Sequence, residues 1–285
     1  MIFITGATGS IGRELCRILA FDNVPARAMC RREEQLDQFK KTGLDAVIAD
    51  FDNPESLRHG MQDCDSLFLL TPPTPEHTQR ESLIIDVAVT SGVKHIVRIS
   101  TADANLSSRL SYAGTHAEVD HYLRSKPVHW TILRPTGFMQ NFIESGHAIA
   151  KGILPHLMGK GQLSYIDSRD IALVAKQTLT ENGHAGAIYY LTGPASLTVK
   201  DVASQLTVAL GHEVRDIDVT ETDMRKTLKS FRLSDWHIGA LIEQFAIGAN
   251  GYEIDVTEEV KRLTGHAPRT FAQFAQDFKD QFLAH

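Results

Sequence analysis

Cysteine is scarce in this sequence, and the spacings that would mark a metal site are absent. The 285 residues include three cysteines, Cys16, Cys30 and Cys64, which lie far apart in apolar or strand-like contexts. No CxxC pair or Cys/His ligand spacing occurs, and the histidines are scattered, which argues against a metal site. We therefore expect three buried thiols, as in a protein from a reducing compartment.

Excess positive charge and long hydrophobic runs are also missing. The formal net charge is −6, whereas a partner such as nucleic acid or a membrane surface normally requires a basic face. No apolar run approaches the roughly 20 residues that cross a bilayer. The N-terminal stretch lacks the basic segment of a signal peptide. These absences predict a cytoplasmic protein with no nucleic-acid or membrane partner.

The first half of the chain alternates strand-like and helical patterns. Several of the strand-like runs are almost continuously apolar, which is typical of parallel strands that are covered on both faces. The alternation predicts βαβ units with right-handed crossovers. The strands are expected at residues 2–5, 26–30, 45–50, 66–71, 95–100 and 129–135. The helices between them are expected near residues 33–42, 54–61, 77–92 and 113–125.

This rhythm changes after residue 135, where glycines interrupt the pattern. Helices are expected at 168–182 and 198–211, with a strand at 187–193 that returns to the sheet. We predict an α/β fold in which residues 1–135 form a Rossmann-type doubly wound parallel sheet, completed by a strand near 187–192. Residues 136–285 would mostly form a smaller C-terminal α+β lobe.

The opening stretch IFITGATGSIGR suits a pyrophosphate. Gly6 allows a tight turn, Gly9 lets the backbone approach the phosphates, and Gly12 lets helix and strand pack closely. The following helix N-terminus supplies N–H groups and partial positive charge. Because these glycines follow a strand and open a βαβ series, they predict a dinucleotide site. The expected contacts are Gly6, Thr8, Gly9, Ser10, Ile11 and Gly12.

The end of the second strand indicates which dinucleotide is bound. Sites that prefer NAD usually place Asp or Glu there to bind the ribose hydroxyls, whereas this chain has Arg31 and Arg32. A guanidinium attracts a 2′-phosphate and stacks on adenine, so the sequence favours NADP(H) over NAD(H). The alternative is that both arginines only cap or flank the next helix, beside Glu33 and Glu34.

Other candidate cofactor contacts end the third, fourth and fifth strands. Ligands of open α/β sheets bind at the carboxyl ends of strands. Simple capping of the strand ends is the alternative for each residue. The candidates are Asp50, Phe51, Thr71, Pro72, Ser100 and Thr101.

Four segments resemble the NmrA-like branch of the atypical short-chain dehydrogenase/reductases, which includes bacterial NADPH quinone reductases and triphenylmethane reductases. They are GATGSIGREL, VKHIVRISTADA, HAEVDHYLRSKPVHWTILRPTGFMQNF and YIDSRDIALVA. The resemblance covers nearly the whole chain and implies NADPH as cofactor and a C-terminal lobe that binds the substrate. It also implies that Thr136, Gly137 and Phe138 line the nicotinamide end, and that Met139, Gln140, Asn141 and Phe142 face the substrate. Tyr165 is a further candidate for an apolar wall of the substrate pocket.

The chain departs from the wider superfamily at its Tyr-xxx-Lys pair. The corresponding stretch YAGTHAEVD contains Tyr112 and His116, one helical turn apart. His116 could bind ribose hydroxyls or relay a proton, since its reference pKa lies near neutrality. Tyr112 could act as an acid, although no lysine occupies the helper position. The alternative is an ordinary exposed helix face.

Three functions compete at this point. The first is an NADPH-dependent reductase that transfers hydride to a quinone-like or other small conjugated electrophile. The second is a sensor that binds NADP(H) and regulates a partner protein without turnover. The third, a nucleotide-sugar epimerase, would need the tyrosine–lysine pair that is missing. The sequence identifies neither the substrate nor an interface for a homodimer or a regulatory partner.

Overall fold

The computed structural model describes residues 1–108, 111–251 and 255–284, and the chain divides into two compact units. The first unit comprises Met1–Arg134 and Ser168–Tyr190. The second unit comprises Pro135–Asp167 and Leu191–His285.

The first unit is built on a seven-stranded sheet with the order β3-β2-β1-β4-β5-β6-β9. The pairs from β3 to β6 are all parallel. The order reverses at β1, which lies between β2 and β4, so the ligand-binding switch point lies at the carboxyl end of β1. The predicted doubly wound fold is therefore confirmed. The strands are β1 (Ile2–Ile4), β2 (Ala26–Cys30), β3 (Asp45–Ile48), β4 (Ser66–Leu69), β5 (His95–Ile99), β6 (His129–Pro135) and β9 (Ala187–Leu191).

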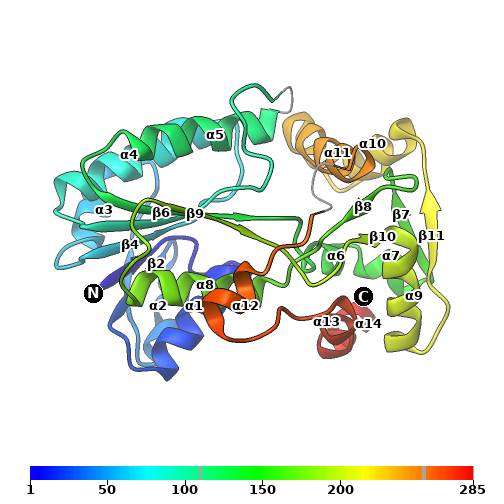
Figure 1. Ribbon diagram of the computed structural model, residues 1–285, viewed down its shortest axis with the longest axis horizontal. Helices are drawn as coiled ribbons and strands as arrows, with labels where there is room; N and C mark the ends of the chain where they lie inside the picture. The colour runs from blue at the N-terminus through cyan, green and yellow to red at the C-terminus, as the bar shows by residue number, and fades with distance from the viewer. Residues whose placement is uncertain (109–110, 252–254, 285) are drawn as a thin grey trace. The chain divides into compact units, whose positions relative to one another are not determined.

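Helices cover both faces of this sheet, with α4 and α5 on one face and α1 and α8 on the other (Figure 1). The core beneath α4 and α5 joins Phe3, Leu67 and Ile96 of the strands to Ile84 and Val119 of the helices. Burying each such side chain contributes about 1.5–3 kcal/mol. The helices are α1 (Ser10–Phe21), α2 (Glu33–Lys40), α3 (Pro54–Gly60), α4 (His77–Thr90), α5 (Ser111–Arg124) and α8 (Ser168–Thr180).

The second unit mixes short strands and helices. β7 (Ile153–His156) pairs in parallel with β11 (Arg215–Asp218), and β8 (Gln162–Leu163) pairs antiparallel with β10 (Leu197–Thr198). Its aromatic core includes Phe142 and Phe271, whose ring centroids are 5.2 Å apart. The helices are α6 (Asn141–Glu144), α7 (Gly146–Ala150), α9 (Val199–Leu210), α10 (Glu221–Ser230), α11 (Asp235–Ala249), α12 (Glu259–Thr264), α13 (Phe271–Asp277) and α14 (Lys279–Leu283).

The ends of α9 show why this sequence forms a helix here. The Thr198 hydroxyl accepts the amide hydrogen of Asp201, and the Asp201 carboxylate accepts the amide hydrogen of Thr198. Gly211 ends the helix with a φ of 79°, a conformation that glycine adopts without strain. Thr198 and Gly211 therefore set the two ends of α9.

The three cysteines are buried and free, as predicted. Burial raises the pKa of the Cys16 thiol to about 12 and that of Cys30 to about 11. Within the described ranges, no helix is both long and apolar enough to cross a bilayer.

Candidate functional site

The three opening glycines form the turn between β1 and α1. Gly6 has a φ of 62°, and a Cβ there would lie 2.8 Å from the carbonyl oxygen of Leu70. A Cβ on Gly12 would lie 2.2 Å from the carbonyl oxygen of Gly6, so only glycine lets α1 pack this closely. Gly9 differs, because it is exposed and its Cβ would come no closer than 3.4 Å to another heavy atom. The bare backbone at Gly9 thus leaves room for a ligand.

The N-terminus of α1 is open to a ligand. Gly9 is the N-cap residue, and no side chain caps the helix. The first amides of α1 therefore present N–H groups and partial positive charge to a phosphate. Ser10 is exposed and Thr8 half-buried at this end, whereas Ile11 is buried. A dinucleotide pyrophosphate fits this turn.

A cavity of about 610 Å³ lies at the ends of β2 and β3. The Gln35 carboxamide oxygen accepts the amide hydrogens of Arg31 at 2.9 Å and Arg32 at 3.1 Å. Because Gln35 caps the start of α2, the exposed arginine side chains are available to an anionic ligand. The lining residues are Thr8, Arg31, Arg32, Gln35, Ile48, Ala49, Asp50, Asn53 and Ser56.

The remaining strand-end candidates lie in different surroundings. Phe51 is buried in the hydrophobic core and does not line the cavity. Pro72 is exposed, and the Thr101 hydroxyl donates to Asp103 Oδ1 at 2.8 Å. Thr71 and Ser100 belong to a buried polar network.

This network lies at the ends of β4 and β5 and is centred on Arg98. The Arg98 side chain is fully buried, and it donates from Nε to Glu81 Oε2 at 2.6 Å and from Nη1 to Asp120 Oδ1 at 2.5 Å. Thr71 donates to Glu81 Oε1 at 2.8 Å, and Ser100 donates to Asp120 Oδ2 at 2.9 Å. The network therefore ties two strand ends to α4 and α5.

The predicted Tyr112 and His116 lie together on α5. Their ring centroids are 4.6 Å apart in an edge-on contact. His116 is 6% exposed, and its Nδ1 lies 3.1 Å from Arg98 Nη2. Burial and the neighbouring Arg98 charge hold the pKa of His116 well below its usual value. His116 is thus a neutral imidazole at neutral pH.

Three predicted contacts begin the second unit. The Thr136 hydroxyl donates to the carbonyl oxygen of Ser164 at 2.5 Å. A Cβ on Gly137 would lie 2.4 Å from Leu163 Cδ2, so a larger residue there would have to displace the leucine side chain. Phe138 forms a parallel bridge with Ile166. These residues hold one segment of the second unit against β8 and the residues that follow it.

The residues predicted to face the substrate are partly brought together. Phe142 and Tyr165 meet edge-on with ring centroids 5.0 Å apart, and the Tyr165 hydroxyl donates to Met158 Sδ at 3.4 Å. Met139 is buried, whereas Asn141 is exposed at the start of α6.

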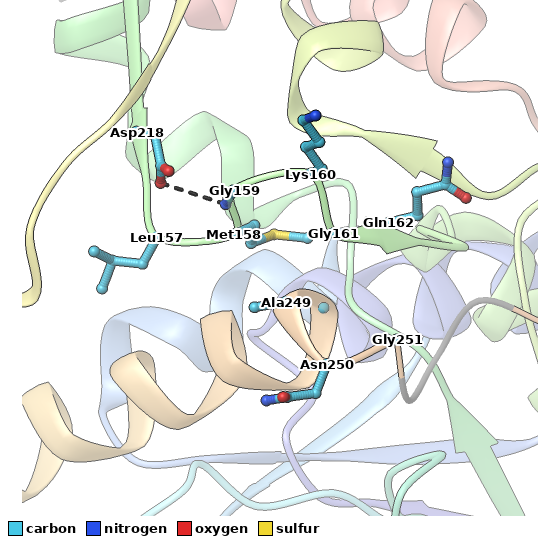
Figure 2. A pocket seen from close by; sticks show the side chains of 11 residues that line it. Leu157, Met158, Gly159, Lys160, Gly161, Gln162, Asp218, Ala249, Asn250 and Gly251 are labelled. Carbon is cyan, nitrogen blue, oxygen red and sulfur yellow. Dashed lines mark hydrogen bonds between the residues drawn. The ribbon is translucent and has the colours of Figure 1, made fainter.

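A groove of about 750 Å³ lies in the second unit. Figure 2 shows its lining residues on the loop after β7 and at the C-terminal end of α11. The amide of Gly159 donates to Asp218 Oδ1 at 3.3 Å. A Cβ on Gly161 would lie 2.4 Å from the carbonyl oxygen of Gly248, so the loop and the helix meet backbone to backbone. The lining residues are Leu157, Met158, Gly159, Lys160, Gly161, Gln162, Asp218, Gly248, Ala249, Asn250 and Gly251.

The sequence alone does not predict most of this groove, because its lining residues come from three distant segments. The glycines of MGKGQ, at residues 158–162, are the local signal of a close backbone approach. Among the residues that the structure describes, no group of three or more His, Cys, Asp or Glu side chains could hold a metal ion.

Comparison with known proteins supports a dinucleotide site in this chain. The NAD(P)H-binding family matches residues 6–182. An NAD(P)H azoreductase from Xenophilus azovorans is 32% identical over 277 residues, which cover 97% of each chain. The structure of NADPH-dependent quinone oxidoreductase from Escherichia coli with NADPH has a TM-score of 0.88 at 26% identity and covers 98% of this chain and 99% of that chain.

Triphenylmethane reductase from Citrobacter sp., solved with NADP(H), shares the fold with a TM-score of 0.87 at 22% identity, over 98% of this chain and 100% of that chain. The family match spans the glycine turn from Gly6, the arginine-lined cavity and the polar network. The chain therefore belongs to the NAD(P)H-binding family and is an NAD(P)H-dependent oxidoreductase.

Proposed function

We propose that this oxidoreductase prefers NADPH to NADH and reduces quinones or other small conjugated electrophiles. The arginine-lined cavity is the observation that carries the cofactor preference. Arg31 and Arg32 stand where an NAD-preferring site has an acidic residue, and they offer two positive charges to a 2′-phosphate. The solved quinone oxidoreductase with bound NADPH supports the same preference.

The acceptor class follows from the missing acid. In place of the lysine of a Tyr-xxx-Lys pair, the chain has His116, which is buried and neutral. A conjugated electrophile accepts hydride without a protein acid, because water can supply the proton afterwards. The names of the relatives, an azoreductase and a quinone oxidoreductase, support acceptors of this kind.

We assign the aromatic part of the acceptor to the second unit. Its groove has Met158 and Leu157 as apolar walls and glycine backbone on both sides, which suits a flat aromatic ring. Met158 also joins the groove to Tyr165 and, through it, to Phe142.

A paired binding and turnover experiment tests the proposal. Fluorescence titration should show that NADPH binds at least about tenfold more tightly than NADH, a difference of about 1.4 kcal/mol. The double variant R31S/R32S should lose most of that difference, because the contacts to the 2′-phosphate are removed and NADH has no such phosphate. R225S, which removes an exposed arginine of the second unit, is the control. Equal affinities in the natural protein would refute the preference.

Turnover is measured as loss of the reduced-nicotinamide absorbance with a panel of quinones, azo dyes and cationic dyes. Steady oxidation of NADPH by at least one of these acceptors is expected. Tight NADPH binding without oxidation by any acceptor would overturn the reductase and favour a sensor that acts through a partner protein.

A further inference from the structure

Hydrogen bonds from Arg98 determine the tautomers of two buried histidines. A guanidinium can only donate hydrogen bonds. Arg98 Nη2 lies 3.1 Å from His116 Nδ1 and 3.3 Å from His77 Nε2, so both of these ring nitrogens accept. The ring hydrogen of neutral His116 is therefore on Nε2, and that of His77 is on Nδ1.

Thr71 provides an independent check of this assignment. His77 Nδ1 lies 3.3 Å from Thr71 Oγ1, and the same hydroxyl donates its hydrogen to Glu81 Oε1 at 2.8 Å. The hydroxyl oxygen then accepts from His77 Nδ1, which must carry the hydrogen. Glu81 Oε2 accepts from Arg98 Nε at 2.6 Å and closes the ring of hydrogen bonds. Every contact is satisfied when both imidazoles are neutral.

Charge balance favours the same state. Arg98 and Arg134 carry two positive charges, and Glu81 and Asp120 carry two negative charges, so the network is neutral when both histidines are. A proton on His116 would add a third positive charge where little water is present. The titratable or charged groups around His116 are Arg98 of β5, His77 of α4, Arg134 of β6, and Tyr112 and Asp120 of its own helix.

We propose that His116 is a catalytic residue that acts as a neutral hydrogen-bond donor, and that Arg98 is the positioning residue that fixes its tautomer. The Nε2–H group would bind the acceptor atom on which negative charge develops. The network places His116 with Thr71 and Ser100 at the ends of β4 and β5, the edge where ligands of this fold bind. A neutral imidazole can serve as such a donor without ever releasing its proton. This inference rests on the proposed reductase function.

The reaction balances without an acid on the protein. Bound NADPH supplies a hydride, which carries two electrons to the quinone. The products are the oxidised cofactor and a hydroquinone monoanion, and water then gives the anion its proton. His116 keeps its hydrogen throughout and stabilises the oxygen anion as it forms.

The first test is spectroscopic and uses the protein without cofactor or acceptor. In histidine labelled with ¹⁵N, the His116 signals, assigned by their loss in H116Q, should show hydrogen on Nε2. They should not titrate between about pH 5.5 and 8, although a free imidazole does so. A hydrogen on Nδ1, or a titration near neutral pH, would overturn the proposal.

The second test separates chemistry from structure. With a quinone, H116F should lower kcat by about 100-fold, because the donor is lost. H116Q should stay within about fivefold, because its side-chain amide is also a neutral donor. The NADPH Kd should be unchanged in both variants.

A cationic triphenylmethane dye is the matched control acceptor. Hydride converts this cation into a neutral product, so no negative charge develops, and H116F should reduce it at a rate within about threefold of the natural protein. An equal loss with both acceptors would show a structural role and overturn the proposal. If the natural protein oxidised NADPH with neither acceptor, the proposed function itself would fail.

Discussion

Arg31 and Arg98 show how burial changes the role of one side chain. Arg31 is exposed and lines the cavity, so its charge is available to a ligand. Arg98 is fully buried, and its charge is balanced by Glu81 and Asp120. Removing one partner of a buried ion pair typically costs about 3–5 kcal/mol. Substitutions of Arg31 should therefore alter ligand binding, whereas substitutions of Arg98 should destabilise the fold.

Alanine substitutions at two glycines of α11 test whether the groove binds the acceptor. A Cβ on Gly248 would lie 2.2 Å from Met158 Cε, so G248A must displace the flexible end of Met158 at the groove wall. We expect the KM for bulky aromatic acceptors to change by about threefold or more, since the wall that contacts the ring has moved. The NADPH Kd should stay constant, because the arginine-lined cavity that we propose for NADPH is lined by residues of the first unit.

G239A is the control for this experiment. A Cβ on Gly239 meets no heavy atom within 4 Å, and both changes gain the same helix propensity of about 1 kcal/mol. Steady-state kinetics of both variants with a one-ring and a three-ring acceptor would show whether only G248A changes the acceptor KM. Unchanged acceptor KM values in G248A would remove the groove from the acceptor site.

At the scale of elements, the turn between β1 and α1 uses glycine at two positions for different reasons. G12A would press a Cβ to within 2.2 Å of the Gly6 carbonyl oxygen, so the turn and helix must separate and the melting temperature should fall. G9A meets nothing closer than 3.4 Å, and Gly9 has a φ of −77°, so the fold should tolerate it.

G9A should nevertheless weaken NADPH binding by about tenfold or more, because its methyl group occupies the surface that the phosphates approach. Thermal unfolding and NADPH titration of both variants check this pair. The expected pattern is an unstable G12A and a stable G9A that binds poorly. A G9A protein with normal affinity would place the pyrophosphate elsewhere.

Sequence patterns predicted these elements well where the signal is local. The strands of the seven-stranded sheet and the glycine turn depend on neighbouring residues, and the sequence predicted both. Phe51 was predicted as a cofactor contact, but it lies in the core, because a pattern of strand ends does not show which way a side chain points. Arg98 was missed because its partners, Glu81 and Asp120, are 17 and 22 residues away. Such contacts depend on how α4 and α5 pack on the sheet.

Across the whole molecule, several histidines stay neutral because they are buried. Burial is the main cause that lowers the pKa of His77, His95, His116 and His156, and for His95 the value falls to about 4. In the unfolded chain each imidazole returns to a pKa of about 6.5. Since the folded pKa is the lower one, the unfolded state binds more protons as the pH falls below about 6.5. The stability that the neutral, buried histidines contribute above that pH should therefore be lost between about pH 6.5 and 4.

His95 allows this loss to be measured in the first unit. Its Nε2 lies 2.9 Å from the Thr131 hydroxyl, a contact that glutamine can replace. In a W236F background, Trp130 on β6 reports unfolding of the first unit. Urea titrations from pH 7 to 4 should show that H95Q takes up about one proton fewer on unfolding than its parent near pH 5, so its stability falls less steeply with acid. An H95Q slope equal to that of the parent would mean that His95 binds its proton equally well in the folded and unfolded states, which would contradict this prediction.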